Sequence, residues 1–341
     1  MILEALEKFV AGKDLARAEA DAVMEEILAG RASDAQIAGL LTALRIKGET
    51  VEELVGFATA MRRHARPVFS TDHRPTGQML VDTCGTGGDA SGTFNVSTAA
   101  AFVAAGAGAR VAKHGNRSIS SKCGSADVLE ALGLNLAVPP ERVGAAIEQV
   151  GIGFLFAPAV HTAMQHAMKA RRDLGMRTVF NLLGPLTNPA GARAQVLGVF
   201  DPRFTEPLAR ALAELGVERA FVVHGADGLD EISLSAETYV AELREGTVRS
   251  YTLAPEDFGL RRAPREALAG GNAKTNSRII RHILEGKPGP QRDIVQANAA
   301  AALVAAGLAE DFREGARVAA QSIDSGAART KLDQLIAFTN T

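Results

Sequence analysis

After about residue 76, the sequence alternates short apolar runs with longer segments of helical character, and this alternation constrains the fold more than any other feature. The apolar runs lie at residues 79–81, 110–112, 152–156, 195–200 and 220–223. Strands that alternate with helices form a mostly parallel sheet, because parallel neighbours need a long crossover connection. Residues 232–252 add a few antiparallel or irregular strands, and the chain from Asn276 onward is mainly helical. The sequence therefore predicts an α/β fold with a mostly parallel central sheet.

The first 64 residues, in contrast, carry only helical patterns. Apolar residues recur at spacings of three and four within residues 2–10, 37–44 and 54–61. Thr50 and Glu53 form a capping box at the start of the last of these helices. Residues 67–77 contain prolines, Ser, Thr and Asp, and form a linker. The predicted organisation is a small N-terminal helical domain at residues 1–75 and a larger α/β domain at residues 76–341.

The overall composition restricts the classes of function. The 341 residues are 47% hydrophobic and carry a formal net charge of −2, which argues against nucleic-acid or membrane-surface binding through bulk charge. The longest uncharged apolar run, residues 99–109, is too short to span a bilayer. Cys84 and Cys123 have neither metal-ligand nor disulfide-framework spacing, and the N-terminus is too acidic for a signal peptide. We expect a cytoplasmic protein with no membrane segment and no nucleic-acid partner.

A glycine-rich loop follows the apolar run at residues 79–81. Gly85, Gly87 and Gly88 allow positive φ angles and expose backbone N–H groups to an anion. The sequence NVST at residues 95–98 then begins a helix, whose free N–H groups also favour negative charge. The loop and the helix start together predict a bound phosphate or pyrophosphate group.

Positive charge is concentrated directly after this loop. No acidic residue lies between Asp89 and Asp127, whereas this interval holds four cations, Arg110, Lys113, Arg117 and Lys122. Chance could produce such a gap in an alanine-rich region, but together with the glycine loop it favours a phosphate ligand. Residues 113–125 follow a predicted strand and are strongly polar. We interpret them as a second binding loop, with an ordinary solvated loop as the alternative.

Two other phosphate-binding motifs are excluded. Residues 85–90, GTGGDA, formally match the dinucleotide pattern G-x-G-x-x-G/A. The helix does not open within the motif, however, and no acidic residue follows about 20 positions later. The loop also lacks the Gly-Lys-Ser/Thr sequence of a P-loop. The glycine loop therefore belongs to neither class.

A pair of acidic residues follows the apolar run at residues 220–223. They are Asp230 and Glu231 in the sequence DGLDE at residues 227–231. Adjacent carboxylates beside a turn could hold Mg²⁺, which usually shares its ligand shell with substrate phosphate. Acidic turns of this kind are also common on protein surfaces, and the prediction gains its weight from the two phosphate-type loops.

Residues 157–175 are predicted to form one helix, with Pro158 in its first turn. This helix places His161 and the pair Arg171 and Arg172 on one broad face, where an arginine could bind a carboxylate ligand. Periodicity does not choose between the two arginines. His161 is equally compatible with a structural and a functional role.

Six motifs stand in a fixed order along the chain. They are CGTGGD at residues 84–89, NVST at 95–98, KHGNRS at 113–118, CGSAD at 123–127, RTVFNLLGPLTNP at 177–189 and DE at 230–231. Together they resemble the anthranilate phosphoribosyltransferases, from the helical N-terminus to Gly270 and Gly271 and beyond. The resemblance implies that the helical domain includes a returning segment near residues 168–190. It also implies a homodimer formed through this domain and Mg²⁺ as the cofactor.

The resemblance further implies a reaction and a set of site residues. The phosphoribosyl group of 5-phosphoribosyl 1-diphosphate (PRPP) would pass to the amine of anthranilate, with release of pyrophosphate, in tryptophan biosynthesis. The residues implied for PRPP are Gly85, Gly88, Asp89, Thr93, Asn95, Val96, Ser97, Thr98, Lys113, His114, Gly115, Asn116, Arg117, Ser118, Ile119, Ser120, Ser121 and Ser125. Those implied for anthranilate are Gly85, His114, Asn116, His161 and Arg171, and those for Mg²⁺ are Ser97, Asp230 and Glu231.

Two alternatives remain open. A pyrimidine nucleoside phosphorylase of the same superfamily would have a different phosphate loop and would lack Arg171 and the pattern at residues 177–189. A non-catalytic relative that binds nucleic acid would need a broad basic surface and would bind DNA in a salt-sensitive manner.

Overall fold

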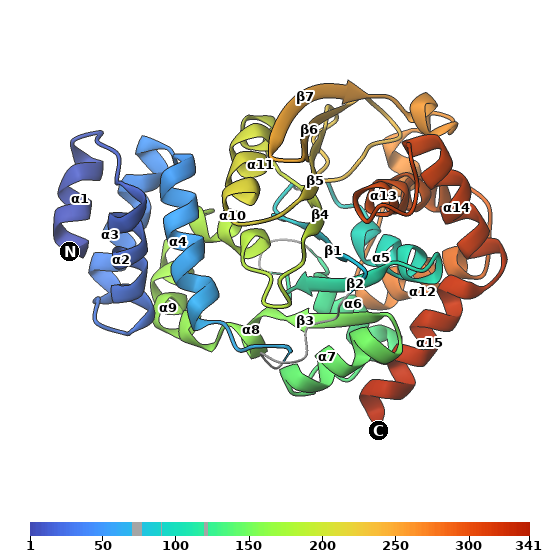
Figure 1. Ribbon diagram of the computed structural model, residues 1–341, viewed down its shortest axis with the longest axis horizontal. Coiled ribbons are helices and arrows are strands. Elements are labelled where there is room, and N and C mark those ends of the chain that lie inside the picture. Colours follow the sequence, from blue (N-terminus) through green and yellow to red (C-terminus); the bar gives the residue numbers. More distant parts are fainter. Residues whose placement is uncertain (70–76, 90, 119–121) are drawn as a thin grey trace.

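The computed structural model describes residues 1–69, 77–89, 91–118 and 122–341. Within these residues a seven-stranded sheet lies between helices, and a lobe of helices adjoins one side (Figure 1). The strands are β1 (Leu80–Gly85), β2 (Arg110–Gly115), β3 (Ile152–Phe156), β4 (Ala194–Gly198), β5 (Arg219–Gly225), β6 (Thr238–Arg244) and β7 (Thr247–Leu253). The α-helices are α1 (Ile2–Val10), α2 (Arg17–Leu28), α3 (Asp34–Lys47), α4 (Val51–His64), α5 (Val96–Gly106), α6 (Ser125–Leu132), α7 (Pro140–Gln149), α8 (Ala157–Val160), α9 (Gln165–Leu174), α10 (Val179–Leu186), α11 (Thr205–Glu214), α12 (Ala273–Leu284), α13 (Pro290–Ala305), α14 (Phe312–Asp324) and α15 (Ala327–Asn340).

The strand order is β3-β2-β1-β4-β5-β6-β7. The five strands from β3 to β5 are parallel, whereas β6 pairs with β5, and β7 with β6, in antiparallel fashion. The predicted α/β fold with a mostly parallel sheet and a helical N-terminal part is confirmed. Because β1 lies between β2 and β4, the chain connections diverge there, and ligands of such sheets bind beyond the carboxyl ends of the strands at this point.

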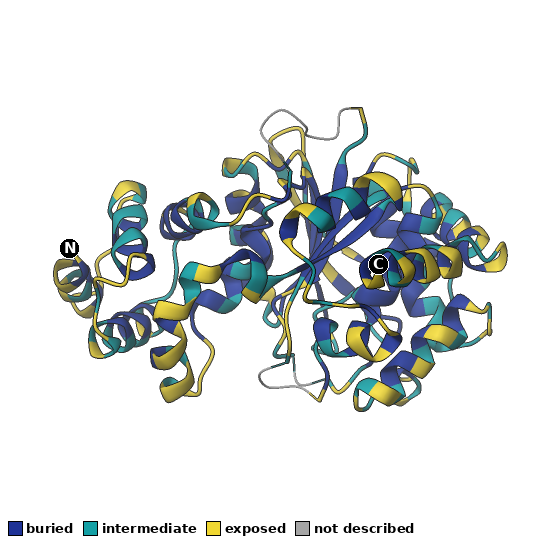
Figure 2. Ribbon diagram, turned by 90° about the horizontal axis from the view of Figure 1, so that it is seen from below, coloured by how far each residue is buried: buried dark blue, intermediate teal, exposed yellow. Residues whose placement is uncertain are grey.

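Helices cover both faces of the sheet, so its strands are buried in the middle of the molecule (Figure 2). On one face, α5 packs against β1 and β2, and α13 against β1, β4 and β5. The alanine-rich sequence of α5 suits this position, because small side chains let its neighbours approach closely; a Cβ at Gly106 would lie 2.4 Å from Ser322 Oγ. The other face is covered by α7 and α11.

The helical lobe combines α1–α4 with two later helices. Helix α9 packs against α2 and α3, and α10 packs against α3 and α4. At the start of α4, the Thr50 hydroxyl accepts from the Glu53 N–H at 3.3 Å and the Glu53 carboxylate accepts from the Thr50 N–H at 2.9 Å, so the capping box is confirmed. Glu53 is fully buried and also accepts from the Leu15 N–H at 2.9 Å and Lys47 at 3.0 Å.

Two predicted elements differ from the structure. The apolar run at residues 79–81 is only the beginning of β1, which continues through the polar residues 82–84 because β2 and β4 satisfy its backbone. The single helix predicted at residues 157–175 is wrong. The chain instead forms α8, a 3-10 turn at Thr162–Met164 and then α9, with His161 outside helical geometry at φ −117° and ψ 57°. The break follows from the redirection of the chain after β3, where Val160 O accepts from the Arg66 N–H at 2.8 Å.

In the part of the chain that the structure describes, none of the helices combines the length and the apolar character needed to cross a membrane.

Candidate active site

The glycine loop lies at the carboxyl end of β1, next to the loop that follows β5. Gly87 and Gly88 have φ angles of 65° and 78°, which glycine adopts without steric cost. The Gly87 N–H donates to Asp230 Oδ2 at 3.0 Å. The prediction of a positive φ at Gly85 is wrong, since this residue ends β1 in extended geometry. Glycine is required there for another reason: a Cβ would lie 2.8 Å from Asp230 Oδ2.

The start of α5 forms the second side of the site. The Ser97 N–H, in the first turn of this helix, donates to Glu231 Oε1 at 3.0 Å. Val96 and Thr98 are buried, and the Thr98 hydroxyl has no hydrogen-bond partner among the described residues. Asn95 does not cap the helix with its side chain. Its amide instead donates to Cys123 O at 3.1 Å and accepts from Asn276 Nδ2 at 3.0 Å, which ties the helix start to the second loop.

Asp230 and Glu231 therefore accept hydrogen bonds from the two segments that were predicted to bind anions. Burial raises the pKa of Asp230 well above its usual range, and the nearby carboxylates of Asp89 and Glu231 add to the effect. Burial likewise raises the pKa of Glu231 to about 7, although Lys113 and the Ser97 N–H oppose the shift. Both acids thus lie in surroundings where their negative charge is under-compensated.

Lys113 supplies a cation inside this acidic site. It lies in β2, is 3% exposed, and its Nζ donates to Thr83 O and, at 3.3 Å, to Ser97 Oγ. Burial lowers its pKa, while the charges of Asp82, Glu231 and Asp230 act in the opposite direction. The ammonium group is therefore held in the interior by surrounding acids.

The donor set fits Mg²⁺. No group of three or more His, Cys, Asp or Glu side chains within the described residues has the arrangement of a protein-only metal site. The site instead has two adjacent carboxylates, Asp230 and Glu231. They lie close to the first turn of α5, which contains Ser97. Mg²⁺ is usually bound by one or two carboxylates together with waters and substrate phosphates. A divalent cation would also stabilise the ionised forms of both carboxylates, whose pKa values are raised chiefly by burial.

The second loop follows β2. Gly115 ends that strand, and a Cβ on it would lie 2.2 Å from Ser125 Oγ. Asn116 O accepts from Ser125 Oγ at 3.2 Å, and the Ser118 N–H donates to Asp127 Oδ2 at 3.1 Å. The predicted residues Ile119, Ser120 and Ser121 lie outside the described residues.

Arg117 differs from the free cation that the charge pattern predicted. Its guanidinium is paired with Asp127 at 3.0 Å and with Glu130 at 2.9 Å, and lies over the Phe156 ring. The two acids of α6, Asp127 and Glu130, therefore neutralise a cation of the segment that contains no acid of its own.

The remaining predicted PRPP residues lie around the glycine loop. Asp89 Oδ1 accepts from the Ser91 N–H at 3.1 Å, and its Oδ2 lies 3.5 Å from the Asp230 nitrogen. Thr93 forms a β-bridge with Ala269, which places the segment before α12 beside the loop. The structure thus brings the loop, the α5 start, Lys113 and the acidic pair together.

His114 and His161 form a buried pair on the side of β2 that faces α10. Their ring centroids lie 5.1 Å apart, and His114 Nδ1 lies 3.1 Å from Gly184 O. Neither Nε2 atom has a hydrogen-bond partner among the described residues. Burial lowers the pKa of His114 to about 3 and that of His161 to about 4. Both rings are therefore neutral near pH 7.

The structure distinguishes the two arginines that periodicity left equivalent. Arg171 is half-buried over the Phe180 ring at 5.0 Å, and burial lowers its pKa. Arg172 is exposed. Within the described residues, Arg171 has no acidic partner, so its charge is available to a carboxylate ligand.

Several residues of the site have no clear signal in the sequence. Asp82 is fully buried and accepts from the His114 N–H at 3.0 Å and from Asn188 Nδ2 at 2.8 Å. Arg177 donates to Gly88 O at 2.6 Å and thereby holds the glycine loop. Asn298 forms two hydrogen bonds with the backbone of Ile232, at 3.0 and 3.1 Å, directly after Glu231. Asp82 and Asn298 lie within apolar stretches, where a single polar residue is the only available signal.

Comparison with known proteins extends over the whole chain. The model of the glycosyl transferase family α/β domain matches residues 77–329, and that of the family's helical bundle domain matches residues 3–65. An anthranilate phosphoribosyltransferase from Symbiobacterium thermophilum is 57% identical over 335 residues, which cover 98% of this chain and 97% of the relative.

Solved structures agree with the sequence comparison. The anthranilate phosphoribosyltransferase of Thermus thermophilus superposes with a TM-score of 0.92 at 48% identity, covering 99% of both chains. Two structures of the Saccharomyces cerevisiae enzyme, in complex with PRPP and Mg and with 4-fluoroanthranilate, give TM-scores of 0.89 and 0.88 at 30% and 29% identity, each covering 99% of this chain and 98% of theirs. By its sequence and by its fold, the chain belongs to the glycosyl transferase family and, within it, to the anthranilate phosphoribosyltransferases.

Proposed function

We propose that this chain transfers the phosphoribosyl group of PRPP to the amine of anthranilate, giving N-(5-phosphoribosyl)anthranilate and pyrophosphate in tryptophan biosynthesis. The observation that carries the proposal is the meeting of anion-binding N–H groups with the Asp230–Glu231 pair at the carboxyl end of β1. The names of the relatives, and the PRPP, Mg and 4-fluoroanthranilate in the yeast structures, support it.

We assign the diphosphate end of PRPP to the glycine loop and the start of α5. Gly85, Gly88, Asp89, Thr93, Asn95, Val96, Ser97 and Thr98 surround this position, and the second loop, from Lys113 to Ser118 and Ser125, borders it. Backbone N–H groups and the buried Lys113 ammonium would stabilise the negative charge that grows on the leaving pyrophosphate.

Asp230, Glu231 and Ser97 would hold Mg²⁺ against the diphosphate. The cation would supply positive charge to the departing oxygens. Asp230 and Glu231 would supply carboxylate oxygens to the cation next to the glycine loop and the start of α5, whose N–H groups contact them in this structure. Asp89 and Lys113 border the same position, and their opposite charges contribute to its net charge.

The reaction breaks the bond between C1 and oxygen and forms the bond between C1 and the anthranilate nitrogen. The electron pair of the broken bond leaves with pyrophosphate, and the amine releases one proton to the solvent. An aryl amine is already neutral at pH 7, so positioning carries much of the rate. His114 and His161 are neutral and only weakly basic. They therefore line the path of anthranilate as polar but uncharged groups rather than as strong bases.

We assign the anthranilate carboxylate to Arg171, with Asn116 and Gly85 on the side that faces PRPP. Arg171 is the half-buried member of the arginine pair and has a lowered pKa caused by burial. An incoming carboxylate would offset that desolvation by a charge-assisted hydrogen bond.

The molecular organisation completes the proposal. We divide the chain into a helical domain, residues 1–75 with the returning segment near residues 168–190, and an α/β domain, residues 76–341; the packing of α9 and α10 on α2–α4 supports this division.

A homodimer formed through the helical domain is supported by the exposed apolar side chains of Met1, Leu3, Val10 and Ile46. The chain has only two cysteines, without the spacing of a disulfide framework, which supports a cytoplasmic location.

The test is a fluorescence assay of anthranilate consumption by the purified protein. Consumption that requires both PRPP and Mg²⁺ is expected. Phosphorolysis of uridine without any consumption of anthranilate would instead identify a nucleoside phosphorylase and overturn the proposal.

A further inference from the structure

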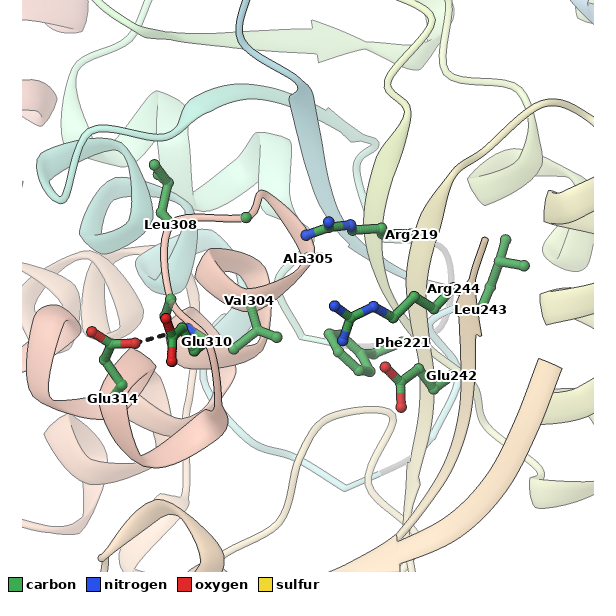
Figure 3. Close-up of a pocket in the computed structure, with 12 residues that line it drawn as sticks. Arg219, Phe221, Glu242, Leu243, Arg244, Val304, Ala305, Leu308, Glu310 and Glu314 are labelled. Carbon is green, nitrogen blue, oxygen red and sulfur yellow. Dashed lines mark hydrogen bonds between the residues drawn. The ribbon is translucent and has the colours of Figure 1, made fainter. Parts of the chain in front are cut away.

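A second cavity lies far from the glycine loop, at the end of the sheet where β5 begins. It is a groove of about 540 Å³ between β5 and β6 on one side and the turn that joins α13 to α14 on the other (Figure 3). This volume falls in the range of small-molecule sites, about 300–1,000 Å³. The loop that contains Asp230 and Glu231 follows the opposite end of β5, seven residues away along the strand. The groove therefore does not belong to the site described above.

Two arginines from neighbouring strands enter this groove. Arg219 on β5 and Arg244 on β6 are direct register partners, and like charges placed directly opposite each other destabilise a sheet. Neither guanidinium forms an ion pair or a side-chain hydrogen bond within the described residues. Arg219 is half-buried, and Gly307 makes room for it, since a Cβ there would lie 3.1 Å from Arg219 Nη1. Two uncompensated cations that face one space form a receptor for an anion.

The other wall of the groove carries the opposite charge. Glu310, in the turn between α13 and α14, lines the wall of the groove opposite the arginines (Figure 3). Its carboxylate has no partner within the described residues, whereas the Glu314 carboxylate accepts from the Glu310 N–H at 2.8 Å. Glu242 is likewise engaged, because it accepts from Tyr251 Oη at 3.0 Å. Glu310 is thus the acid of the groove that is free to receive a cation.

The surface between these charges is apolar. Phe221 of β5 and Val304 of α13 lie between the two walls (Figure 3), and Leu308 also lines the groove. A ligand that fits all three parts carries a carboxylate for the arginines, an ammonium for Glu310 and an apolar body for the floor.

We propose that this groove binds a free α-amino acid with a large apolar side chain. The carboxylate pairs with Arg219 and Arg244, the ammonium with Glu310, and the side chain packs on Phe221 and Val304. The ligand thereby relieves the repulsion between the two cross-strand arginines. The proposal is independent of the reaction at the glycine loop.

Isothermal titration of the full-length protein with L-phenylalanine and L-tryptophan tests this site. Saturable binding of at least one of them is expected, with 3-phenylpropionate, which lacks the ammonium, and phenethylamine, which lacks the carboxylate, each binding at least about tenfold more weakly, because each loses a charge-assisted hydrogen bond. The double variant Arg219→Gln, Arg244→Gln should weaken the binding by at least about tenfold for the same reason. Arg278→Gln on α12, an exposed arginine outside the groove, is the matched control and should leave it unchanged.

One further variant, and two further measurements on the double variant, separate this groove from the catalytic site and from loss of folding. Arg171→Ala should leave amino-acid binding unchanged. The double arginine variant should keep its basal turnover and its melting temperature, since it removes a repulsion. The proposal is overturned by absence of saturable binding of both amino acids, by equal binding to the double variant and to Arg278→Gln, by loss of binding in Arg171→Ala, or by 3-phenylpropionate binding as tightly as the preferred amino acid.

Discussion

Asp230 and Glu231 each accept a backbone N–H from a segment whose composition suits it to bind phosphate. The Gly87 N–H contacts Asp230 and the Ser97 N–H contacts Glu231, both at 3.0 Å. In this conformation the acids occupy donors that a diphosphate would use. At the proposed site, binding of Mg²⁺ and PRPP would redistribute these hydrogen bonds: the carboxylates would turn to the cation and the N–H groups to the diphosphate.

The double variant Asp230→Asn, Glu231→Gln should lose Mg²⁺-dependent turnover by at least about 100-fold, the usual scale for removal of an electrostatic contact to a transition state. It should also resist heat at least as well as the natural chain, because it removes two charges whose pKa values are raised by burial. Steady-state kinetics and calorimetry measure the two effects. Near-normal turnover would show that Asp230 and Glu231 do not bind the metal.

Arg171→Ala is expected to raise the KM for anthranilate by about 10- to 100-fold, the loss of one charged hydrogen bond. The KM for PRPP should stay within about twofold. Arg172→Ala is the matched control, since Arg172 is adjacent but exposed. A raised KM for PRPP together with an unchanged KM for anthranilate would show that the assignment is wrong.

The buried histidines make the protein sensitive to acid. The pKa is lowered to about 3 at His114 and to about 4 at His161, whereas an unfolded histidine titrates near 6.5. The unfolded chain therefore binds more protons between these values, and the folded state loses stability as the pH falls below about 6.5. Buried acids with raised pKa values, such as Asp82 at about 6, act in the opposite direction.

His161→Phe isolates one of these contributions. The variant removes a titrating group, so the free energy of unfolding should fall less steeply between pH 6.5 and pH 4, by up to about 1.4 kcal/mol per pH unit. Urea denaturation at pH 7.5, 6, 5 and 4 measures the difference between the variant and the natural chain. Parallel pH profiles for the two proteins would contradict the assignment of a low pKa to His161.

Among the elements, α13 contacts both the sheet and the loop that contains Asp230 and Glu231. Asn298 on this helix is 2% exposed, and its amide accepts from the Ile232 N–H at 3.0 Å and donates to Ile232 O at 3.1 Å and Ile294 O at 2.9 Å. The helix thus fixes the backbone immediately after Glu231. Asn298 is a positioning residue for the acidic pair.

Asn298→Ala should raise the Mg²⁺ concentration needed for half-maximal turnover several-fold and lower the free energy of unfolding by about 1–3 kcal/mol, because it leaves the buried Ile232 groups unpaired. Val295→Ala, a buried substitution on the same helix, should lower stability without affecting the Mg²⁺ dependence. Equal effects of both variants on the Mg²⁺ dependence would indicate that Asn298 acts only through stability.

The elements also show how far the sequence could predict the site. The apolar run at residues 152–156 coincides with β3, since a strand buried on both faces has a continuous apolar sequence. Strand β1 ends in Asp82, Thr83, Cys84 and Gly85, and no hydrophobic pattern reveals that part. Gly85 and its register partner Gly198 both make room for Asp230, where Cβ atoms would lie 2.8 Å from its Oδ2 and 1.5 Å from its backbone oxygen. Asp230 lies 145 positions from Gly85 and 32 from Gly198 along the chain, so this requirement cannot be recognised before the fold is known.

At the scale of the whole molecule, the helical lobe carries the proposed dimer surface. Leu3 and Val10 lie seven residues apart on one face of α1 and are 56% and 75% exposed, and Ile46 at the end of α3 is 82% exposed. A contiguous patch of exposed apolar side chains marks an interaction surface, and we propose that these three residues contribute to one.

The variant Val10→Glu, Ile46→Glu should convert the proposed homodimer to a monomer, because burial of two charges in an apolar interface is unfavourable. Light scattering on a size-exclusion column measures the mass. Tyr239→Glu, at a 45% exposed position on β6, is the matched control and should leave the mass unchanged. An unchanged mass in the double variant would exclude this face as the interface.

The return of α9 and α10 to the N-terminal helices has a consequence during synthesis. Helix α4 ends at His64, but α9, which covers α2 and α3, begins only at Gln165, about 100 residues later. At a translation rate of about 5–20 residues per second, the first four helices leave the ribosome about 5–20 s before the helix that covers them. During that interval the buried Ala167 and Ala170 of α9 are not yet present to cover them. The nascent chain therefore exposes an apolar face of its first helices before the α/β domain has been synthesised. A chaperone would have its greatest effect on the yield at this stage.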